Sequence, residues 1–275
     1  MFRHALTAGA VLLAGAVFVV AAQAQPAATA APDFSGLWQH REAPPPGPPG
    51  AQQLAGYEQR GSRGAGGVRQ DPIPAIADLS DPLFRPETAA KLKEVVDKRI
   101  AGELILPARS LCWPNGVPGT IALGGNPMQI LQTPTQVTIY HIEGPELRHI
   151  YLNVPHSEHV EPSWYGESVG HYEGDTLVVD TIGLNTHTVV DDFQTPHTEA
   201  LHVVERYRLL EGGEAIEVTF AVEDQGAFTR PWTGAQNLRR VAEKAEFEEI
   251  YCAENNFDVL TGRPYPLPTA TKLDF

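Results

Sequence analysis

The chain has 275 residues, of which 42% are hydrophobic and 20% charged, with 25 Gly, 24 Pro and 2 Cys. This composition excludes collagen, a coiled coil and wholesale disorder, and it fits one large or two small globular domains. The formal net charge is -14, which argues against a protein whose main role is to bind nucleic acid or an anionic membrane surface.

Residues 1–24 have the features of a secretory signal peptide. Arg3 supplies the positive charge, Ala5 to Val20 form the apolar stretch, and Ala22-Gln23-Ala24 is a small-x-small cleavage site. A membrane anchor is the alternative, but the apolar stretch is short for a spanning helix and a polar segment follows it. We therefore expect cleavage near Ala24, a periplasmic or secreted protein, and no stable membrane insertion.

The two cysteines, Cys112 and Cys252, are far apart in the sequence. In an oxidising compartment they are expected to form a disulfide, which would contribute roughly 4 to 5 kcal/mol in the chain-entropy treatment. They match neither a zinc site nor a CxxC redox motif, and a catalytic Cys paired with a distant His is the alternative.

Before the main domain pattern begins, residues 43–67 are rich in Pro, Gly, Ala and Gln, so we expect an extended insertion there. A helix is predicted over residues 86–101. Pro86 suits its first position, and Leu92, Val96 and Ile100 recur at helical spacing.

After Asn126 the hydrophobic pattern has a period of two, interrupted by short turns such as Gly174-Asp175. We expect one strand near the start of the mature chain and nine in this region: 34–39, 128–133, 136–142, 147–153, 165–173, 176–182, 201–210, 215–222, 228–241 and 247–252. Short links favour antiparallel neighbours, and so many strands tend to close. Residues 25–275 are thus predicted to be one mainly β domain, an antiparallel meander that closes into a lipocalin/calycin-like barrel of about 8–10 strands with one packed helix.

Gly36-Leu37-Trp38 is similar to the Gly-x-Trp that opens the first strand of lipocalin-type barrels. That resemblance implies that Trp38 closes one end of the barrel and that an Arg from a late strand, Arg239 or Arg240, lies across it.

Longer blocks resemble a widespread group of secreted, uncharacterised bacterial proteins, and together they cover nearly the whole mature chain. The resemblance implies secretion and a single domain and assigns no catalytic residues. The blocks are 32–38, 127–134, 170–180, 197–207 and 254–256.

The hairpin around Gly174-Asp175 is the first candidate site. If these two residues form the turn, His171 faces Val178 and is a diagonal neighbour of Asp180 on one face. Both would point into the barrel with the candidate ligand-binding residues Tyr165 and Glu167, which makes His171 and Asp180 a candidate catalytic base and its partner. The alternative is a rim histidine that only satisfies Asp180.

Glu205 and Tyr207 form the second candidate, because they share the otherwise apolar face of strand 201–210. A buried carboxyl group with a raised pKa would suit acid catalysis. The alternative is an internal ion pair with Arg148, Arg230 or Arg239.

A metal site is a minority alternative, since several potential ligands lie between residues 187 and 202 and none has an HExxH-like spacing. They are His187, His197, Glu199 and His202, with Asp191 and Asp192 nearby. His156 and His159 are interpreted as solvated loop histidines.

The sequence contains no GxSxG elbow, P-loop or dinucleotide-binding fingerprint, and we expect no organic cofactor. The predicted function is an exported acid-base enzyme, a lyase, isomerase or hydrolase, acting on a small apolar or aromatic molecule in the barrel. The alternatives are a non-catalytic lipocalin-type carrier and an envelope interaction protein. Neither the substrate nor the oligomeric state follows from the sequence.

Overall fold

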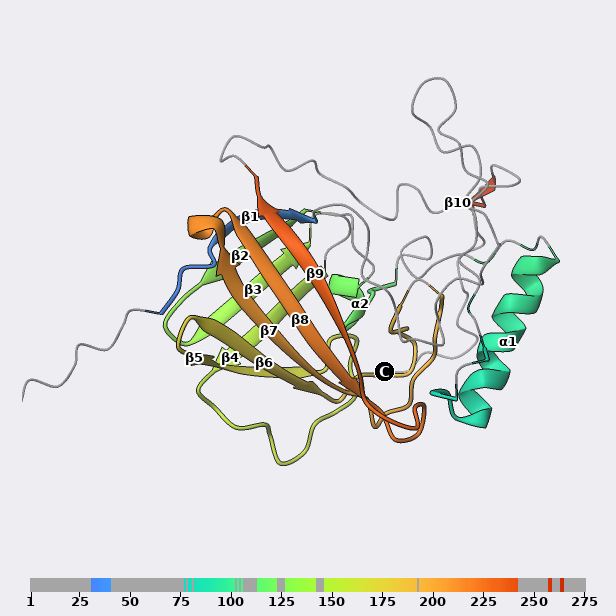
Figure 1. The fold of residues 1–275 in the computed structure, drawn as a ribbon. Coiled ribbons are helices and arrows are strands. Elements are labelled where there is room, and N and C mark those ends of the chain that lie inside the picture. The colour runs from blue at the N-terminus through green and yellow to red at the C-terminus, as the bar shows by residue number, and fades with distance from the viewer. Residues whose placement is uncertain are drawn as a thin grey trace, which may run out of the picture. The chain divides into compact units, whose positions relative to one another are not determined.

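A closed barrel of nine strands, arranged in sequence order, dominates the computed structural model (Figure 1). The described residues are 31–40, 77, 79–80, 82–101, 103, 105, 113–122, 127–141, 146–191 and 193–241, with the backbone of β10 (Phe257–Asp258) and β11 (Arg263–Pro264). The barrel strands are β1 (Gly36–His40), β2 (Met128–Gln132), β3 (Gln136–His141), β4 (Glu146–Leu152), β5 (Glu167–Glu173), β6 (Thr176–Ile182), β7 (His202–Leu210), β8 (Ala215–Glu223) and β9 (Trp232–Arg240).

The predicted mainly β, lipocalin-like barrel of 8–10 strands is confirmed, and the predicted strand limits mostly agree within two residues. The largest shift is at β9, which begins at Trp232 instead of residue 228. Phe228 precedes β9 and forms an isolated antiparallel bridge with Phe84. The predicted signal peptide, insertion 43–67, strand 247–252 and both cysteines lie outside the described residues.

Strand pairing departs from the predicted antiparallel meander at one seam. β4 and β5 are parallel, with Ile150 opposite Ser168, whereas all other neighbours are antiparallel. Parallel neighbours need a connection that returns to the other end of the strand. Residues 153–166 make this crossover, while 174–175 and 211–214 are tight turns between antiparallel strands.

The first and last strands close the barrel beside Trp38. Its indole is fully buried and donates a hydrogen bond from Nε1 to the Phe34 carbonyl oxygen at 2.8 Å. The Arg240 guanidinium lies 4.2 Å from the indole ring centre and donates hydrogen bonds to the carbonyl oxygens of Gly213 and Ser35, both at 2.8 Å. Gly36 has φ +133, and a Cβ there would meet Arg240. The predicted Trp–Arg arrangement is confirmed, and Arg240 is the arginine involved.

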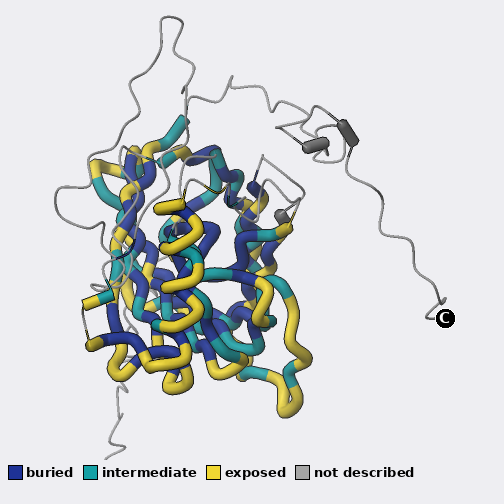
Figure 2. Tube along the Cα trace, turned by 90° about the vertical axis from the view of Figure 1, so that its right-hand side faces the viewer, coloured by how far each residue is buried: buried dark blue, intermediate teal, exposed yellow. Residues whose placement is uncertain are grey.

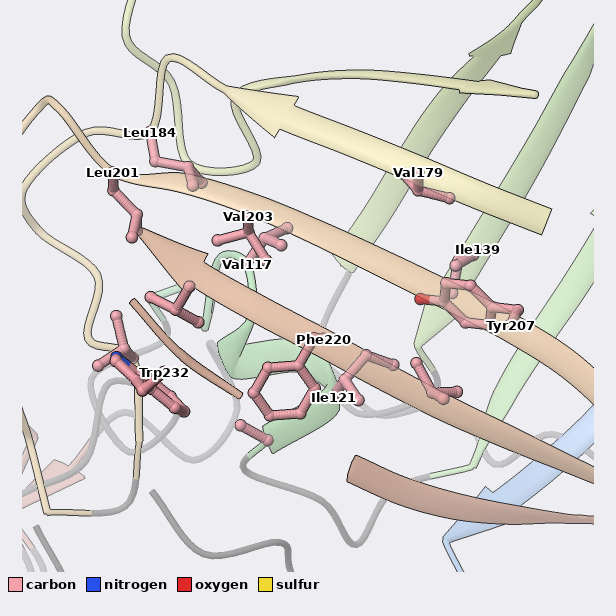
Figure 3. Packing of buried hydrophobic residues seen from close by; sticks show 14 of the residues in the cluster. Val117, Ile121, Ile139, Val179, Leu184, Leu201, Val203, Tyr207, Phe220 and Trp232 are labelled. Carbon is pink, nitrogen blue, oxygen red and sulfur yellow. The ribbon is translucent and has the colours of Figure 1, made fainter. Parts of the chain in front are cut away.

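The barrel's opposite end, called here the loop-bearing end, receives the long connections between strands. The short helix α2 (Gly119–Ala122) is buried and contacts β9. Its Ile121 and the preceding Val117 join the core with Val203, Phe220 and Trp232 (Figure 3). This end is therefore packed with apolar side chains from both strands and loops.

The helix predicted over 86–101 is α1 (Pro86–Ile100). Pro86 occupies its first turn, and Leu92 and Val96, one turn apart, belong to the core cluster. The rest of its surface is largely exposed, as its side facing the viewer in Figure 2 shows. No helix among the described residues is long and apolar enough to cross a membrane.

Replacing Arg240 with Met should destabilise the barrel by about 3 kcal/mol, because a cation–π contact and two partly buried hydrogen bonds are lost. Urea unfolding followed by tryptophan fluorescence measures the change. Arg239→Met is the matched control, since Arg239 is the exposed neighbour on the same strand and should leave the midpoint unchanged. Equal effects of the two substitutions would contradict this role of Arg240.

Candidate functional site

The β5–β6 hairpin has the predicted register but the opposite orientation. His171 pairs with Val178, and Val169 pairs with Asp180. The side chains of His171 and Asp180 are 54% and 41% exposed, so they lie on the outer wall of the barrel. The prediction that His171, Asp180 and Glu167 point into the barrel is therefore wrong. Tyr165 precedes β5 and packs against the core.

His171 is also separated from its predicted partner. Its Nε2 lies 3.2 Å from Glu173 Oε1, and the other Glu173 oxygen accepts a hydrogen bond from Arg206 at 2.6 Å. The Arg206 hydrogen bond, followed by that of His171, lowers the pKa of the Glu173 carboxyl group. The predicted His171–Asp180 pair is not formed.

Glu205 and Tyr207 do lie inside the barrel, as predicted, and they belong to a network around Arg148. The guanidinium donates to both Glu205 carboxylate oxygens, at 3.0 and 2.5 Å, and the Tyr207 hydroxyl donates to Glu205 Oε1 at 2.9 Å. Arg148 also donates to Ser168 Oγ and Thr181 Oγ1. Of the three arginines considered as partners of Glu205, Arg148 is the one used.

This network is closed to solvent. Arg148 and Glu205 are 1% and 0% exposed, so both charged groups are buried inside the barrel. Burial disfavours the charge on Arg148, but the Glu205 carboxylate outweighs it and raises the pKa of Arg148. Burial and the same carboxylate raise the pKa of Tyr207 well above its ordinary value. This geometry supports a structural role, because the charges are paired and no ligand reaches them.

The Arg148 network also explains the orientation of the β5–β6 hairpin. Ser168 and Thr181 are buried and hydrogen-bond to each other at 3.0 Å as well as to Arg148. Since side chains alternate along a strand, placing these two hydroxyl groups inside turns Glu167 and Asp180 outward. A buried guanidinium needs such partners, and they are polar residues on a face that is otherwise apolar.

Asp180 is the centre of a second cluster on the outer wall. Its Oδ1 lies 3.0 Å from Nε2 of His156 and 3.0 Å from Nε2 of His202. His156 comes from the crossover, while His202 begins β7, the strand next to β6. The interpretation of His156 as a solvated loop histidine is therefore wrong; nothing in the local sequence pattern indicates which strand the crossover passes.

Glu167 joins this cluster and holds the crossover. It accepts hydrogen bonds from the backbone N–H and hydroxyl group of Ser157, and its Oε1 lies 2.9 Å from His156 Nδ1. The Ser157 hydroxyl group, more than any other neighbour, lowers the pKa of the Glu167 carboxyl group. When Glu167 and Asp180 are both ionised they can only accept hydrogen bonds, so both ring nitrogens of His156 must donate one. Both ring nitrogens of His156 are therefore used in contacts that hold the crossover.

His202 is more available for chemistry. Asp180 fixes its Nε2 as a hydrogen donor, which leaves Nδ1 to accept a proton. Nδ1 lies 3.9 Å from Glu223 Oε2, beyond hydrogen-bond length, and the side chain is 34% exposed. A carboxylate-oriented histidine open to solvent can act as a general base.

Three aromatic rings gather at the loop-bearing end. Trp113, Trp164 and His187 come from three separate loops, and their ring centres lie 5.6 to 5.8 Å apart in each pair. Trp113 is 45% exposed and His187 is also exposed. We refer to these residues as the aromatic trio. The two tryptophans occur outside the strand pattern, in loops rich in Pro. Large aromatic residues in such loops are the sequence signal that could have indicated this cluster.

The loops that carry the aromatic trio are fixed to the barrel. Ser163, next to Trp164, exchanges backbone hydrogen bonds with Gly183 and Asn185. Gly116 packs so closely on Thr188 that a Cβ would lie 2.6 Å from its methyl carbon. Beneath them, the Thr188 hydroxyl group hydrogen-bonds to His197 Nε2 at 2.8 Å. Burial lowers the pKa of His197, which favours a neutral ring that donates from Nδ1 to the Thr198 carbonyl oxygen.

The four residues of the metal alternative are distributed over different environments. His187 belongs to the aromatic trio, His197 is buried, Glu199 is exposed, and His202 contacts Asp180. Among the residues with described placement, no group of three or more His, Cys, Asp or Glu side chains could hold a metal ion.

Replacing Glu205 with Gln should destabilise the protein by about 3 to 5 kcal/mol, because the charge of Arg148 stays buried without its partner. The double variant Arg148→Met/Glu205→Leu should lose less than Glu205→Gln alone, since no charge is left inside. Urea unfolding measures both. Glu217→Gln, which breaks the exposed Glu217–Arg208 pair, is the control and should leave the midpoint unchanged. A larger loss in the double variant would contradict this account.

Comparison with known proteins adds no assignment to these residues. No protein-family model, curated protein or solved structure matches the chain. The roles proposed below therefore rest on the geometry and chemistry of the described residues.

Proposed function

We propose that this protein is an exported barrel that binds a small, flat apolar or aromatic molecule on the aromatic trio. The observation that carries the proposal is the exposure of Trp113 beside Trp164 and His187, on loops held in place by the barrel. Exposed clusters of large apolar side chains typically mark binding sites. The predicted signal peptide adds the periplasm or the medium as the place of action.

The chemistry of the aromatic trio supports this class of ligand. Indole rings offer broad apolar faces that stack on flat molecules, and the imidazole of His187 adds a polar edge. Because the protein carries a net charge of -14, neutral ligands would approach it more readily than anions. The closed Arg148 network favours this end over the barrel interior as the place of binding.

Replacing Trp113 or Trp164 with Ala should weaken binding of N-phenyl-1-naphthylamine, a neutral aromatic probe, by about tenfold, because one stacking surface is lost. Probe fluorescence during titration measures the affinity. Tyr151→Ala is the matched control, since Tyr151 is 48% exposed on another part of the barrel. Absence of probe binding, or equal losses in all three variants, would contradict the proposed site.

A second candidate function, acid-base catalysis by a lyase, isomerase or hydrolase, is favoured by one specific observation. Asp180 orients His202 so that Nδ1 can accept a proton from a bound molecule. In this mechanism His202 is the base and Asp180 is the positioning residue. A protein that binds ligands without turning any over would instead be the lipocalin-type carrier.

The catalytic candidate is tested by incubating the protein with a metabolite mixture and identifying any compound that is converted. His202→Gln should then lower kcat by about 10² to 10⁴, the usual contribution of a general base. Asp180→Asn should lower kcat as well, because the carboxylate that orients the base is lost. His171→Gln is the control and should retain full activity, since His171 pairs with Glu173. Unchanged turnover in His202→Gln would exclude this mechanism.

A further inference from the structure

The outer wall of the barrel over β2, β3 and β4 carries most of the exposed large hydrophobic side chains among the described residues. Of the seven large hydrophobic side chains exposed among the described residues, four lie on these strands and a fifth, Val154, follows β4. The four are Leu131, Tyr140, Leu147 and Tyr151, which are 37% to 54% exposed. Tyr140 lies directly opposite Leu147, while Leu131 lies opposite Thr138 and Tyr151 opposite Gln136 on the same face.

The remaining outward side chains of these three strands are polar: three are amide or hydroxyl groups and one is a histidine. We define the β2–β4 face by its eight outward residues: Gln129, Leu131, Gln136, Thr138, Tyr140, Leu147, His149 and Tyr151. His149 is tied into it, since its Nδ1 lies 2.7 Å from Gln136 Nε2 and 3.2 Å from Thr138 Oγ1. No Asp, Glu, Lys or Arg belongs to this face.

The other wall of the barrel is very different. The outward residues of β5 to β9 include five carboxylates and three arginines: Glu167, Glu173, Asp180, Glu217, Glu223, Arg206, Arg208 and Arg239. The chain has 34 acidic and 20 basic residues in all, yet none of them is among the described outward residues of β2 to β4. Few charged residues together with exposed tyrosines are typical of the central part of protein interfaces.

We propose that the β2–β4 face is the contact between two copies of this chain in a symmetric dimer. In a two-fold contact each face meets an identical face, so any net charge on it meets charge of the same sign. Two copies with a net charge of -14 repel each other, and the β2–β4 face allows contact without opposing carboxylates. The glutamines, threonine and tyrosines supply groups that both donate and accept hydrogen bonds, which suits a self-complementary surface.

Barrel closure determines how the two copies meet. All nine strands have neighbours on both sides, so no strand edge of the barrel is open to pair with another chain. Association must therefore use side chains, wall against wall, at the β2–β4 face. The residues of this face are different from those of the aromatic trio, and the contact does not depend on the proposed ligand binding.

Sedimentation equilibrium of the full chain at about pH 8 tests the proposal over roughly 1 to 100 µM. The wild type should dimerise in this range. Leu147→Asp and Leu147→Lys should each weaken the dimer at least about tenfold, because either charge would be desolvated in the contact. Ile100→Asp is the matched control: Ile100 is 60% exposed on α1, and the charge change is the same. Tyr151→Glu is a second disruptive variant.

Salt gives an independent test. Raising the ionic strength from 0.1 to 1 M shortens the Debye length from about 10 to about 3 Å, which should strengthen a dimer opposed by like charge. An interface made of ion pairs would weaken instead. The proposal is overturned if the wild type is monomeric throughout, if the Leu147 variants dimerise as well as Ile100→Asp, or if salt dissociates the dimer. A monomer that floats with neutral lipid vesicles would assign the face to a membrane surface and also overturn it.

Discussion

One buried guanidinium constrains the middle of the barrel. Arg148 on β4 reaches side chains on β5, β6 and β7, and it requires an anion and hydroxyl groups on the inner faces of those strands. Because side chains alternate, the choice of Ser168, Thr181 and Glu205 for the inside also decides which residues face outward. The internal Arg148–Glu205 salt bridge and its hydroxyl partners thus determine that Asp180 faces outward, where it contacts His202.

Much of the architecture could be predicted from local pattern. Alternating hydrophobicity and tight turns locate most strands within two residues, and Gly36 with Trp38 indicates the closed end of the barrel. These signals are local because they arise from neighbouring residues on one strand or turn. The position of Glu205 on an apolar face likewise predicts burial and pairing, and Arg148 was among the partners considered.

The candidate site was harder to predict because it depends on contacts between distant segments. Leu177, Val178 and Val179 form an unbroken apolar run, so alternation does not reveal which side of β6 faces the core. Ser168 and Thr181, which accept hydrogen bonds from Arg148, are polar residues on the inner face, so polarity does not identify the outer face of β5 and β6 either. His156 reaches Asp180 only because β4 and β5 are parallel, which lays the crossover along the outer wall.

The closure of the barrel by its first and last strands has a consequence for biosynthesis. Ser35 and Arg240, which share a hydrogen bond across the seam, are 205 positions apart in the chain. β1 is synthesised long before β2 and longer still before β9, so one of its edges has no partner until β2 is made and the other has none until β9 is made. Exposed strand edges promote aggregation of incomplete chains. An incomplete chain of this protein therefore exposes one edge of β1 until translation reaches β9.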